Sequence, residues 1–330
     1  MPKRLDDIAE TCWYSGSWLS VLLLPFSWVF AGITLVRRFL YAKNILARPL
    51  LPVPVIVVGN ISVGGTGKTP VVAWLAKQLA AQGYRPGIVS RGYGGSYQGS
   101  PRLVVADDDP AVVGDEPLML VQQTGLPLCI AADRVAAVQA VASQDVNVVI
   151  ADDGLQHYRL RRVAELVVVD VERGLGNGRL LPAGPLRESA KRLKQVDAVL
   201  LNGKHSDLNG VVFNLEGDDI VFVNDGGRRS LSAFSGARVW ALAGIGNPQR
   251  FYSRLEEAGL VLDLAPVPDH GVLDLHKLIR EREQPILMTE KDAVKYRQNP
   301  PEGVWFLEVE AVFELAEAAK LLQSVTAILS

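Results

Sequence analysis

The residues most able to do chemistry form one short loop, residues 62–69, with the sequence Ser-Val-Gly-Gly-Thr-Gly-Lys-Thr. An apolar run at 53–58 precedes the loop and a helical pattern at 71–79 follows it. This order of strand, glycine-rich turn and helix is typical of a phosphate-binding loop, because the glycines let backbone N–H groups converge on phosphate oxygens. We therefore expect the whole loop to bind nucleotide phosphates. Its residues are Ser62, Val63, Gly64, Gly65, Thr66, Gly67, Lys68 and Thr69.

Two side chains of the loop have expected roles. Lys68 should reach the β- and γ-phosphates, and the Thr69 hydroxyl should contact Mg²⁺. The usual pattern, G-x-x-x-x-G-K-[ST], begins with glycine, whereas this loop begins with Ser62. Gly64 and Gly65 can keep the loop flexible. The alternative is a glycine-rich turn that only happens to contain Lys-Thr, and the flanking strand and helix argue against it.

A second acidic motif follows another apolar run. Asp152 and Asp153 come directly after residues 146–151, at the carboxyl end of an expected strand, where open α/β sheets bind ligands. Beside a phosphate loop, such a pair suits a Walker-B role in which a carboxylate holds Mg²⁺. Helix capping is the alternative role for paired aspartates in a turn.

Asp115 and His270 are candidates for proton transfer. Asp115, in Gly-Asp-Glu-Pro, comes just before an expected helix, so it either caps that helix or takes a proton from an attacking hydroxyl. His270 follows a stiff Ala-Pro-Val-Pro-Asp stretch and is either a structural histidine or a partner that orients a catalytic carboxylate. Spacing alone does not show that the two residues meet.

Further polar residues come near other expected strand ends. The turn after residue 90 carries Arg91 and Tyr93, Arg134 starts a helix, and Gln156 and His157 follow the paired aspartates. These side chains suit an anionic substrate, although a glycine-rich loop is the alternative for the first turn. The turn at 180–188, Leu-Leu-Pro-Ala-Gly-Pro-Leu-Arg-Glu, has no chemistry that its residues alone reveal.

The apolar runs alternate with helical patterns, which predicts an α/β fold with a doubly wound, mostly parallel sheet of P-loop NTPase type. We expect four segments: an N-terminal, membrane-associating helical segment at 1–45, a P-loop core at 46–205, a linker with a small antiparallel element at 206–235, and a second, smaller α/β lobe at 236–330. The last lobe is expected to contain a helix at 249–258, strands at 286–289 and 304–309, and a closing helix at 312–329. Ligands bind in the cleft between such lobes.

The composition excludes several classes of partner. The formal net charge of −2 gives no general basic field, so nucleic acid is not an expected partner. Two distant cysteines, Cys12 and Cys129, form neither a disulfide framework nor a metal cluster, which suits a reducing cytosol. Nothing demands a dimer, and we expect a monomer.

The N-terminal segment is unusually apolar. No residue between Glu10 and Arg37 is charged, and three tryptophans lie in this stretch. Serines and Pro25 dilute it, so we favour a membrane-associating helix at the interface over one that spans the bilayer, and either over a buried core helix. The catalytic part should face the cytoplasm, where ATP is found.

Taken together, the motifs resemble those of the tetraacyldisaccharide 4′-kinases of lipid A biosynthesis. The resemblance covers nearly the whole chain and rests on six motifs in order: residues 58–70 with the phosphate loop, Ser-Arg91-Gly-Tyr93, Gly-Asp115-Glu-Pro, Asp152-Asp-Gly-Leu-Gln-His157, Leu-Leu-Pro-Ala-Gly-Pro-Leu-Arg187-Glu and Pro-Asp-His270. Ser62 also resembles this family's own loop.

The resemblance implies an ATP- and Mg²⁺-dependent transfer of the γ-phosphate to the 4′-hydroxyl of a tetraacylated disaccharide 1-phosphate, giving lipid IVA. It implies Asp115 as base with His270 as its partner, Lys68 and Asp153 as further catalytic residues, and Thr69, Asp152 and Asp153 at the metal. It also implies a place at the cytoplasmic face of the inner membrane. Residues implied near the acylated lipid substrate are Asn60, Arg91, Tyr93, Arg134, Gln156 and His157.

Two other classes are weighed against the kinase. A membrane-associated regulatory or partitioning ATPase shares Gly-Gly-x-Gly-Lys-Thr but carries a lysine where this chain has Val63. A GTP-binding switch protein would need an Asn-Lys-x-Asp motif. Thr289-Glu-Lys-Asp292 does not match that motif, and we expect it to be a surface turn.

Overall fold

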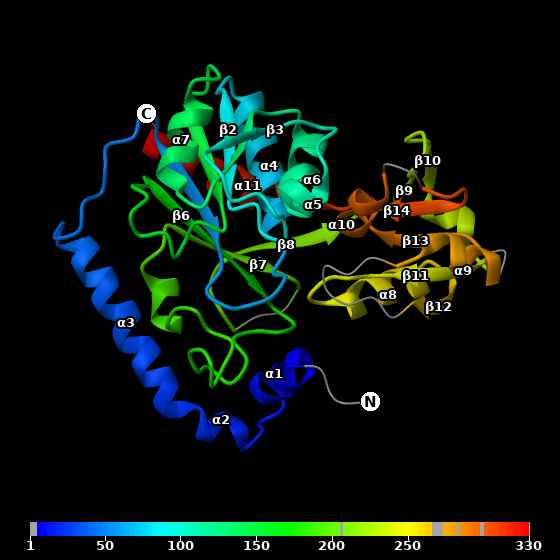
Figure 1. Cartoon of the computed structure of the whole chain (residues 1–330), viewed down its shortest axis with the longest axis horizontal. Helices are drawn as coiled ribbons and strands as arrows, with labels where there is room; N and C mark the ends of the chain where they lie inside the picture. The colour runs from blue at the N-terminus through cyan, green and yellow to red at the C-terminus, as the bar shows by residue number, and fades with distance from the viewer. Residues whose placement is uncertain (1–4, 205–206, 266–272, 282–283, 298–299, 330) are drawn as a thin grey trace.

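Two β-sheets, each covered by helices, form two lobes that lie side by side (Figure 1). The computed structural model describes residues 5–204, 207–265, 273–281, 284–297 and 300–329. His270 lies outside the described residues.

The larger lobe is built on a nine-stranded sheet with β1 (Val55–Gly59) at its centre. All strand pairs inside the two edges are parallel, and the two edge strands are antiparallel to their neighbours. The order is β15 (Glu310–Phe313), β8 (Val211–Glu216), β7 (Ala198–Asn202), β6 (Ala164–Asp170), β1, β5 (Val148–Asp152), β2 (Pro86–Ser90), β4 (Leu128–Ile130) and β3 (Arg102–Val104).

Both faces of this sheet are buried. Along β1, Ile56 and Val58 belong to one apolar cluster and Val55 and Val57 to another, since successive strand side chains point to opposite faces. This confirms the expected α/β fold with a doubly wound, mostly parallel sheet. Helices α4 (Lys68–Ala81), α6 (Asp115–Thr124) and α11 (Leu315–Leu329) cover the first face, and α7 (Arg134–Ala142) covers the second; α5 (Pro110–Val113) and the 3₁₀ helix η1 (Ala190–Lys194) are short connecting elements.

The smaller lobe has a six-stranded sheet. Its order is β10 (Arg228–Ser230), β9 (Asp219–Phe222), β14 (Val304–Leu307), β13 (Ile286–Thr289), β11 (Arg238–Leu242) and β12 (Val261–Ala265). Around it lie α8 (Pro248–Glu257), α9 (Leu275–Glu281), α10 (Glu290–Ala293) and the 3₁₀ helices η2 (Leu231–Phe234) and η3 (Val294–Tyr296). Strand β12 and helix α9 are elements that the sequence did not predict.

Two strands from segments expected in the linker and in the smaller lobe belong to the sheet of the larger lobe. The segment expected as a linker contains β8, which pairs in parallel with β7 in the larger sheet. The expected helix at 312–329 begins at Leu315, because Ala311 and Phe313 are buried in a strand that pairs with β8. The Phe313 ring lies 5.2 Å from that of Phe213, so the last residues return to the first lobe. The boundaries of the folding units stay a prediction.

The N-terminal segment consists of α1 (Leu5–Tyr14), α2 (Leu19–Leu22) and α3 (Leu24–Ala42), which run along the outside of the larger lobe (Figure 1). Pro25 does not kink a helix, since it lies in the first turn of α3, where its missing N–H costs nothing. Within the described residues, no helix is both long and apolar enough to cross a membrane. Large apolar side chains that are more than half exposed here are Trp18, Val21, Leu22, Phe26, Trp28, Val29, Ile33, Leu35, Val36 and Phe39.

Candidate functional site

The carboxyl ends of the central parallel strands meet at one edge of the larger sheet, where β1, β5 and β2 end at Gly59, Asp152 and Ser90. A cleft of about 1480 Å³ opens over this edge and is lined by residues of both lobes. The expected site residues that line the cleft are Val63, Gly64, Gly65, Thr66, Gly67, Lys68, Thr69, Arg91, Tyr93, Arg134, Asp153, Gln156 and His157. The structure therefore brings most of the expected set together.

The remaining described site residues, Asn60, Ser62, Asp115 and Asp152, are buried beside the cleft. Asn60, expected near the substrate, is fully buried and supports the phosphate loop instead. Its amide Nδ2 donates to the Gly64 carbonyl and to the Thr66 hydroxyl, both at 3.4 Å.

The backbone of the phosphate loop explains where glycine is required. Gly64 and Gly67 have φ values of +112° and +89°, in the left-handed region that favours glycine. A Cβ on Gly67 would also lie 2.7 Å from the Nδ2 atom of Asn202. Ser62, by contrast, does not have a positive φ, so the backbone at the first position of this loop has no need of glycine.

Asp153 holds two cations at the same edge. Its Oδ1 lies 3.6 Å from the Lys68 Nζ, and its Oδ2 accepts from Arg187 Nη1 at 3.0 Å. Burial alone would raise the pKa of Asp153, but the Lys68 ammonium and the Arg187 guanidinium together lower it below its ordinary value. The φ of +50° at Asp153 is left-handed and costs on the order of 1 kcal/mol for a non-glycine residue. Neither aspartate caps a helix.

Asp152 is the more deeply buried of the pair. Burial and the Glu116 carboxylate raise its pKa, more than Lys68 and Arg134 lower it. Its Oδ1 is buried without a hydrogen-bond partner among the described residues. An orphaned carboxylate oxygen next to a phosphate loop fits a Mg²⁺ ion, because hard cations take oxygen ligands and favour the charged form.

No group of three or more His, Cys, Asp or Glu in the described chain is arranged to hold a metal ion. A Mg²⁺ ion that binds together with a nucleotide takes several of its ligands from phosphate oxygens and water.

Asp115 is not a helix cap. The cap of α6 is Gly114, with a φ of +94°, and Asp115 is the first residue of the helix. Its Oδ2 lies 3.6 Å from the Nζ of Lys295, which belongs to the smaller lobe. The Asp115 carboxylate therefore faces a cation of the other lobe.

The prediction that residues 289–292 form a surface turn is wrong. Thr289, Glu290 and Asp292 are buried, because β13 ends here directly against the larger lobe. Glu290 accepts from the Gln123 amide at 2.8 Å, and burial raises its pKa to about 7. Lys291 pairs with Glu116 at 3.1 Å, so this segment forms the contact of the smaller lobe with α6.

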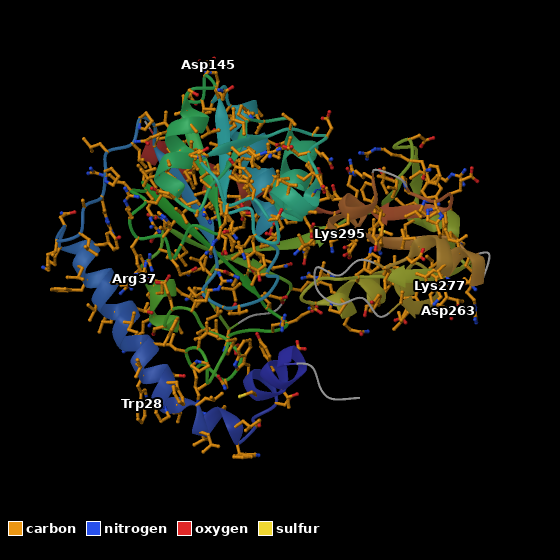
Figure 2. All side chains as sticks on the ribbon, viewed as in Figure 1. Trp28, Arg37, Asp145, Asp263, Lys277 and Lys295 are labelled. Atoms are coloured by element: carbon orange, nitrogen blue, oxygen red, sulfur yellow. The ribbon has the colours of Figure 1, made fainter. Side chains whose placement is uncertain are left out.

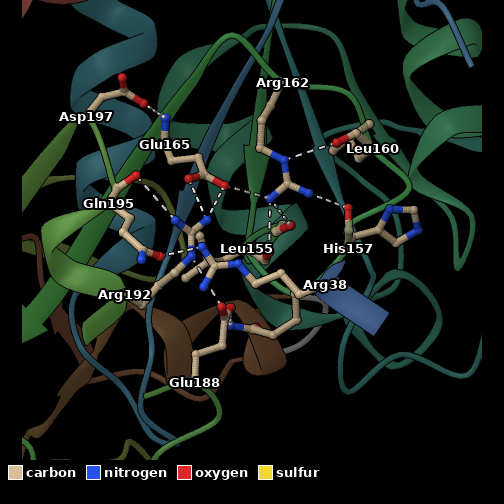
Figure 3. Close-up of polar contacts among 12 residues, drawn as sticks. Arg38, Leu155, His157, Leu160, Arg162, Glu165, Glu188, Arg192, Gln195 and Asp197 are labelled. Carbon is tan, nitrogen blue, oxygen red and sulfur yellow. Dashed lines mark hydrogen bonds and ion pairs between the residues drawn. The ribbon is translucent and has the colours of Figure 1, made fainter. Parts of the chain in front are cut away.

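A network of buried ions braces the loop after the aspartates (Figure 3). The Gln156 amide donates to the Asn60 carbonyl at 3.1 Å and to Glu188 at 3.0 Å. Glu188 in turn pairs with Arg192, which also binds Glu165. Next to it, the guanidinium of Arg162 donates to the carbonyls of residues 155, 157 and 160. The loop at 154–160 is therefore held by Glu188 through Gln156 and by the guanidinium of Arg162.

His157 and Arg134 line the cleft beside this loop. Burial and the nearby Arg134 charge lower the pKa of His157 to about 4, so its imidazole is neutral at pH 7. Arg134 is buried and donates to the Ala131 carbonyl at 2.8 Å. Arg91 and Tyr93 lie in the exposed turn after β2, at the open side of the cleft.

The smaller lobe also touches the phosphate loop. A Cβ on Gly246 would lie 2.7 Å from the backbone nitrogen of Gly65, so only glycine permits this approach. Arg250, on α8, donates to Asn202 at 2.7 Å, and Asn202 donates to the Thr66 carbonyl at 3.1 Å. The lobe thus contacts the loop by backbone and by side chain.

The turn at 180–188 holds the N-terminal helices. Ser27 on α3 donates to the Leu180 carbonyl at 2.8 Å and accepts from the Ala183 N–H at 3.0 Å. Trp13 on α1 donates to the Pro182 carbonyl at 2.9 Å. The other side of the turn binds the phosphate loop, where the Val63 N–H donates to the carbonyl of residue 185 at 2.8 Å. One turn therefore connects the apolar helices to the loop.

Comparison with known proteins agrees with this geometry. The family model Tetraacyldisaccharide-1-P 4′-kinase (LpxK) matches residues 19–327. This chain belongs to the tetraacyldisaccharide-1-P 4′-kinase family. The 4′-kinase of Alkalilimnicola ehrlichii is 49% identical over 312 residues, which are 92% of each chain. That of Methylobacillus flagellatus is 44% identical over 329 residues, 99% of this chain and 98% of the relative.

A solved structure is similar as well. The crystal structure of LpxK from Aquifex aeolicus in complex with ATP matches with a TM-score of 0.78 and 30% identity, over 94% of this chain and 100% of that chain. The expected 4′-kinase family, its place in lipid A biosynthesis and its P-loop type of fold are thus confirmed.

Several residues of this 4′-kinase site were not expected from the sequence. In the sequence, Arg187 stands in a turn rich in proline and glycine, which indicates an ordered backbone but does not indicate its contact with Asp153. Lys295, Asn202 and Arg250 gave no signal, since each is distant in the chain from the residue that it contacts.

The lowered pKa of His157 predicts a pH effect on stability. The unfolded histidine binds a proton near pH 6.5, whereas the folded one does so only near pH 4, so acid stabilises the unfolded chain. Stability from this residue is present above pH 6.5 and is lost as the pH falls towards 4. We expect His157→Gln to reduce the fall in urea midpoint between pH 7 and pH 5. An equal fall in both proteins would contradict the assignment.

Proposed function

We propose that this 4′-kinase transfers the γ-phosphate of ATP to the 4′-hydroxyl of a tetraacyldisaccharide 1-phosphate at the cytoplasmic face of the inner membrane, forming lipid IVA. The main support for this proposal is the set of residues that line the cleft. The cleft that contains Lys68 of the phosphate loop extends to Phe30 and Ile33 of the apolar helix α3. A single cleft with a phosphate-binding end and an apolar end suits a donor nucleotide and a lipid acceptor.

The phosphate loop is proposed to bind ATP. Its backbone N–H groups and the N-terminus of α4 attract the phosphates, and Lys68 neutralises the β- and γ-phosphate oxygens. Asp153 supports this role, since its pairing with Lys68 and Arg187 keeps both cations at the strand edge.

Thr69, Asp152 and Asp153 are the proposed ligands of Mg²⁺. When bound, the ion would neutralise charge that develops on the phosphates. Asp152 suits this position because its buried Oδ1 has no other partner among the described residues.

Asp115 is proposed as the base. Its carboxylate accepts the proton of the 4′-hydroxyl while the new bond from that oxygen to the γ-phosphorus forms, the bond to the β-phosphate oxygen breaks, and ADP leaves. His270 is its proposed partner. Arg91, Tyr93, Arg134, Gln156 and His157 line the cleft and are proposed to hold the acceptor.

The N-terminal helices are proposed to lie on the membrane. Each methylene of an acyl chain that leaves the bilayer costs about 0.8 kcal/mol, so the enzyme must come to the lipid. Helix α3 exposes Trp28 on its outer side (Figure 2), and Val29 and Phe26 are exposed as well. Ser27 is buried and donates to the turn at 180–188. This orientation keeps the apolar side chains outward and the cleft close to the surface.

The direct assay combines ATP, Mg²⁺ and the tetraacyldisaccharide 1-phosphate in detergent micelles. We expect phosphate on the lipid and one ADP for each phosphate transferred. ATP hydrolysis without a phosphorylated lipid would instead favour a regulatory ATPase.

Asp115→Asn removes the proposed base and keeps its size. We expect kcat to fall about 10²- to 10⁴-fold while ATP affinity stays nearly unchanged. Asp145→Asn is the control, since Asp145 is an exposed loop residue far from the cleft (Figure 2). Collapse of ATP binding with full turnover at saturation would exclude Asp115 as the base.

Trp28→Ser tests the membrane surface. Loss of one large apolar side chain should weaken partition onto anionic lipid vesicles about tenfold, measured by co-sedimentation. The control is Leu264→Ser, because Leu264 is similarly exposed on the smaller lobe. Equal effects of the two changes would count against an N-terminal docking surface.

A further inference from the structure

Lys295 is an almost completely buried cation at the junction of the two lobes (Figure 2). Its side chain is 5% exposed, and its Nζ lies 2.9 Å from Asp292 and 3.6 Å from Asp115. Asp292 belongs to the same lobe as Lys295, whereas Asp115 starts α6 in the other lobe. The ammonium therefore lies between one carboxylate of its own lobe and one carboxylate across the junction.

Asp292 fixes the ammonium from the side of the smaller lobe. It has no exposed surface, and its Oδ2 accepts from the Gly244 N–H at 2.8 Å and from the Thr289 hydroxyl at 2.7 Å. Gly244 and Thr289 lie at the carboxyl ends of β11 and β13. The position of the Lys295 Nζ is thus set by the edge of the second sheet.

Because the Lys295 ammonium is buried, its contact with Asp115 across the junction is needed to compensate its charge. A buried ammonium is costly unless opposite charges and hydrogen bonds compensate it, and removal of one partner leaves an uncompensated charge. Lys295 is not among the residues that line the cleft, whereas Lys291 is. The geometry therefore favours a contact with the carboxylate of Asp115 over a contact with a bound phosphate.

We propose that Lys295 is a positioning residue for the phosphoryl transfer, which acts by orienting the Asp115 carboxylate. The inference rests on the proposed function, since it takes Asp115 as the base. Because Lys295 is supplied by the smaller lobe, the base is oriented only when that lobe is seated against α6. The smaller lobe thereby contributes to catalysis through a residue that touches neither substrate.

The test measures kcat, the KM for ATP and thermal unfolding of the full chain with Lys295→Met. A 1 Å displacement of a catalytic group can cost about a hundredfold in rate, so we expect kcat to fall about a hundredfold with an almost unchanged KM for ATP. Lys277→Met, an exposed lysine of the same lobe, is the matched control and should keep wild-type kcat (Figure 2). Lys295→Gln, which can still donate to Asp292, replaces Lys295→Met if that variant does not fold.

The decisive comparison is a double-mutant cycle with Asp115→Asn. If Lys295 acts through Asp115, Lys295→Met should lower kcat little further in the Asp115→Asn background. Full additivity of the two losses, or wild-type kcat in a folded Lys295 variant, would overturn the proposal while leaving Asp115 as the base. Wild-type kcat in Asp115→Asn alone would instead overturn the proposed base.

Discussion

The pairing of one carboxylate with two cations connects the parts of this 4′-kinase. Asp153 binds Lys68 of the phosphate loop and Arg187 of the turn at 180–188. These two ion pairs hold the phosphate loop after β1 and the turn at 180–188 against the end of β5. The pairing lowers the pKa of Asp153 despite its burial, which keeps the carboxylate charged at the strand edge. The left-handed backbone of Asp153 is retained because these contacts stabilise it.

The same turn explains how an enzyme with a lipid substrate can be assembled around a nucleotide site. Its outer side accepts hydrogen bonds from Trp13 and Ser27, and its inner side binds the phosphate loop through Val63. The apolar helices and the phosphate site are therefore linked by hydrogen bonds rather than by a flexible tether. A bilayer surface along α3 would bring the lipid hydroxyl towards the open side of the cleft.

Sequence patterns predicted the sheet core and most of the site, since buried parallel strands are continuous apolar runs and their carboxyl ends carry the motifs. They failed where a contact joins distant segments. Phe313 looked like part of a helix, although its burial on Phe213 places it in a strand. Asp292 looked like a residue of a polar turn, but its charge is compensated by Lys295 and by the edge of the second sheet. A local sequence pattern does not indicate which distant residue a side chain contacts.

A crystal structure with a non-hydrolysable ATP analogue, Mg²⁺ and the acylated disaccharide 1-phosphate bound together would test the proposed roles of Lys68 and Asp115 directly. We expect the γ-phosphate against Lys68, the ion between Thr69 and the paired aspartates, and the 4′-hydroxyl within hydrogen-bond distance of the Asp115 carboxylate. A 4′-hydroxyl that faces a different base, with Asp115 still buried against Lys295, would contradict the proposed role of Asp115.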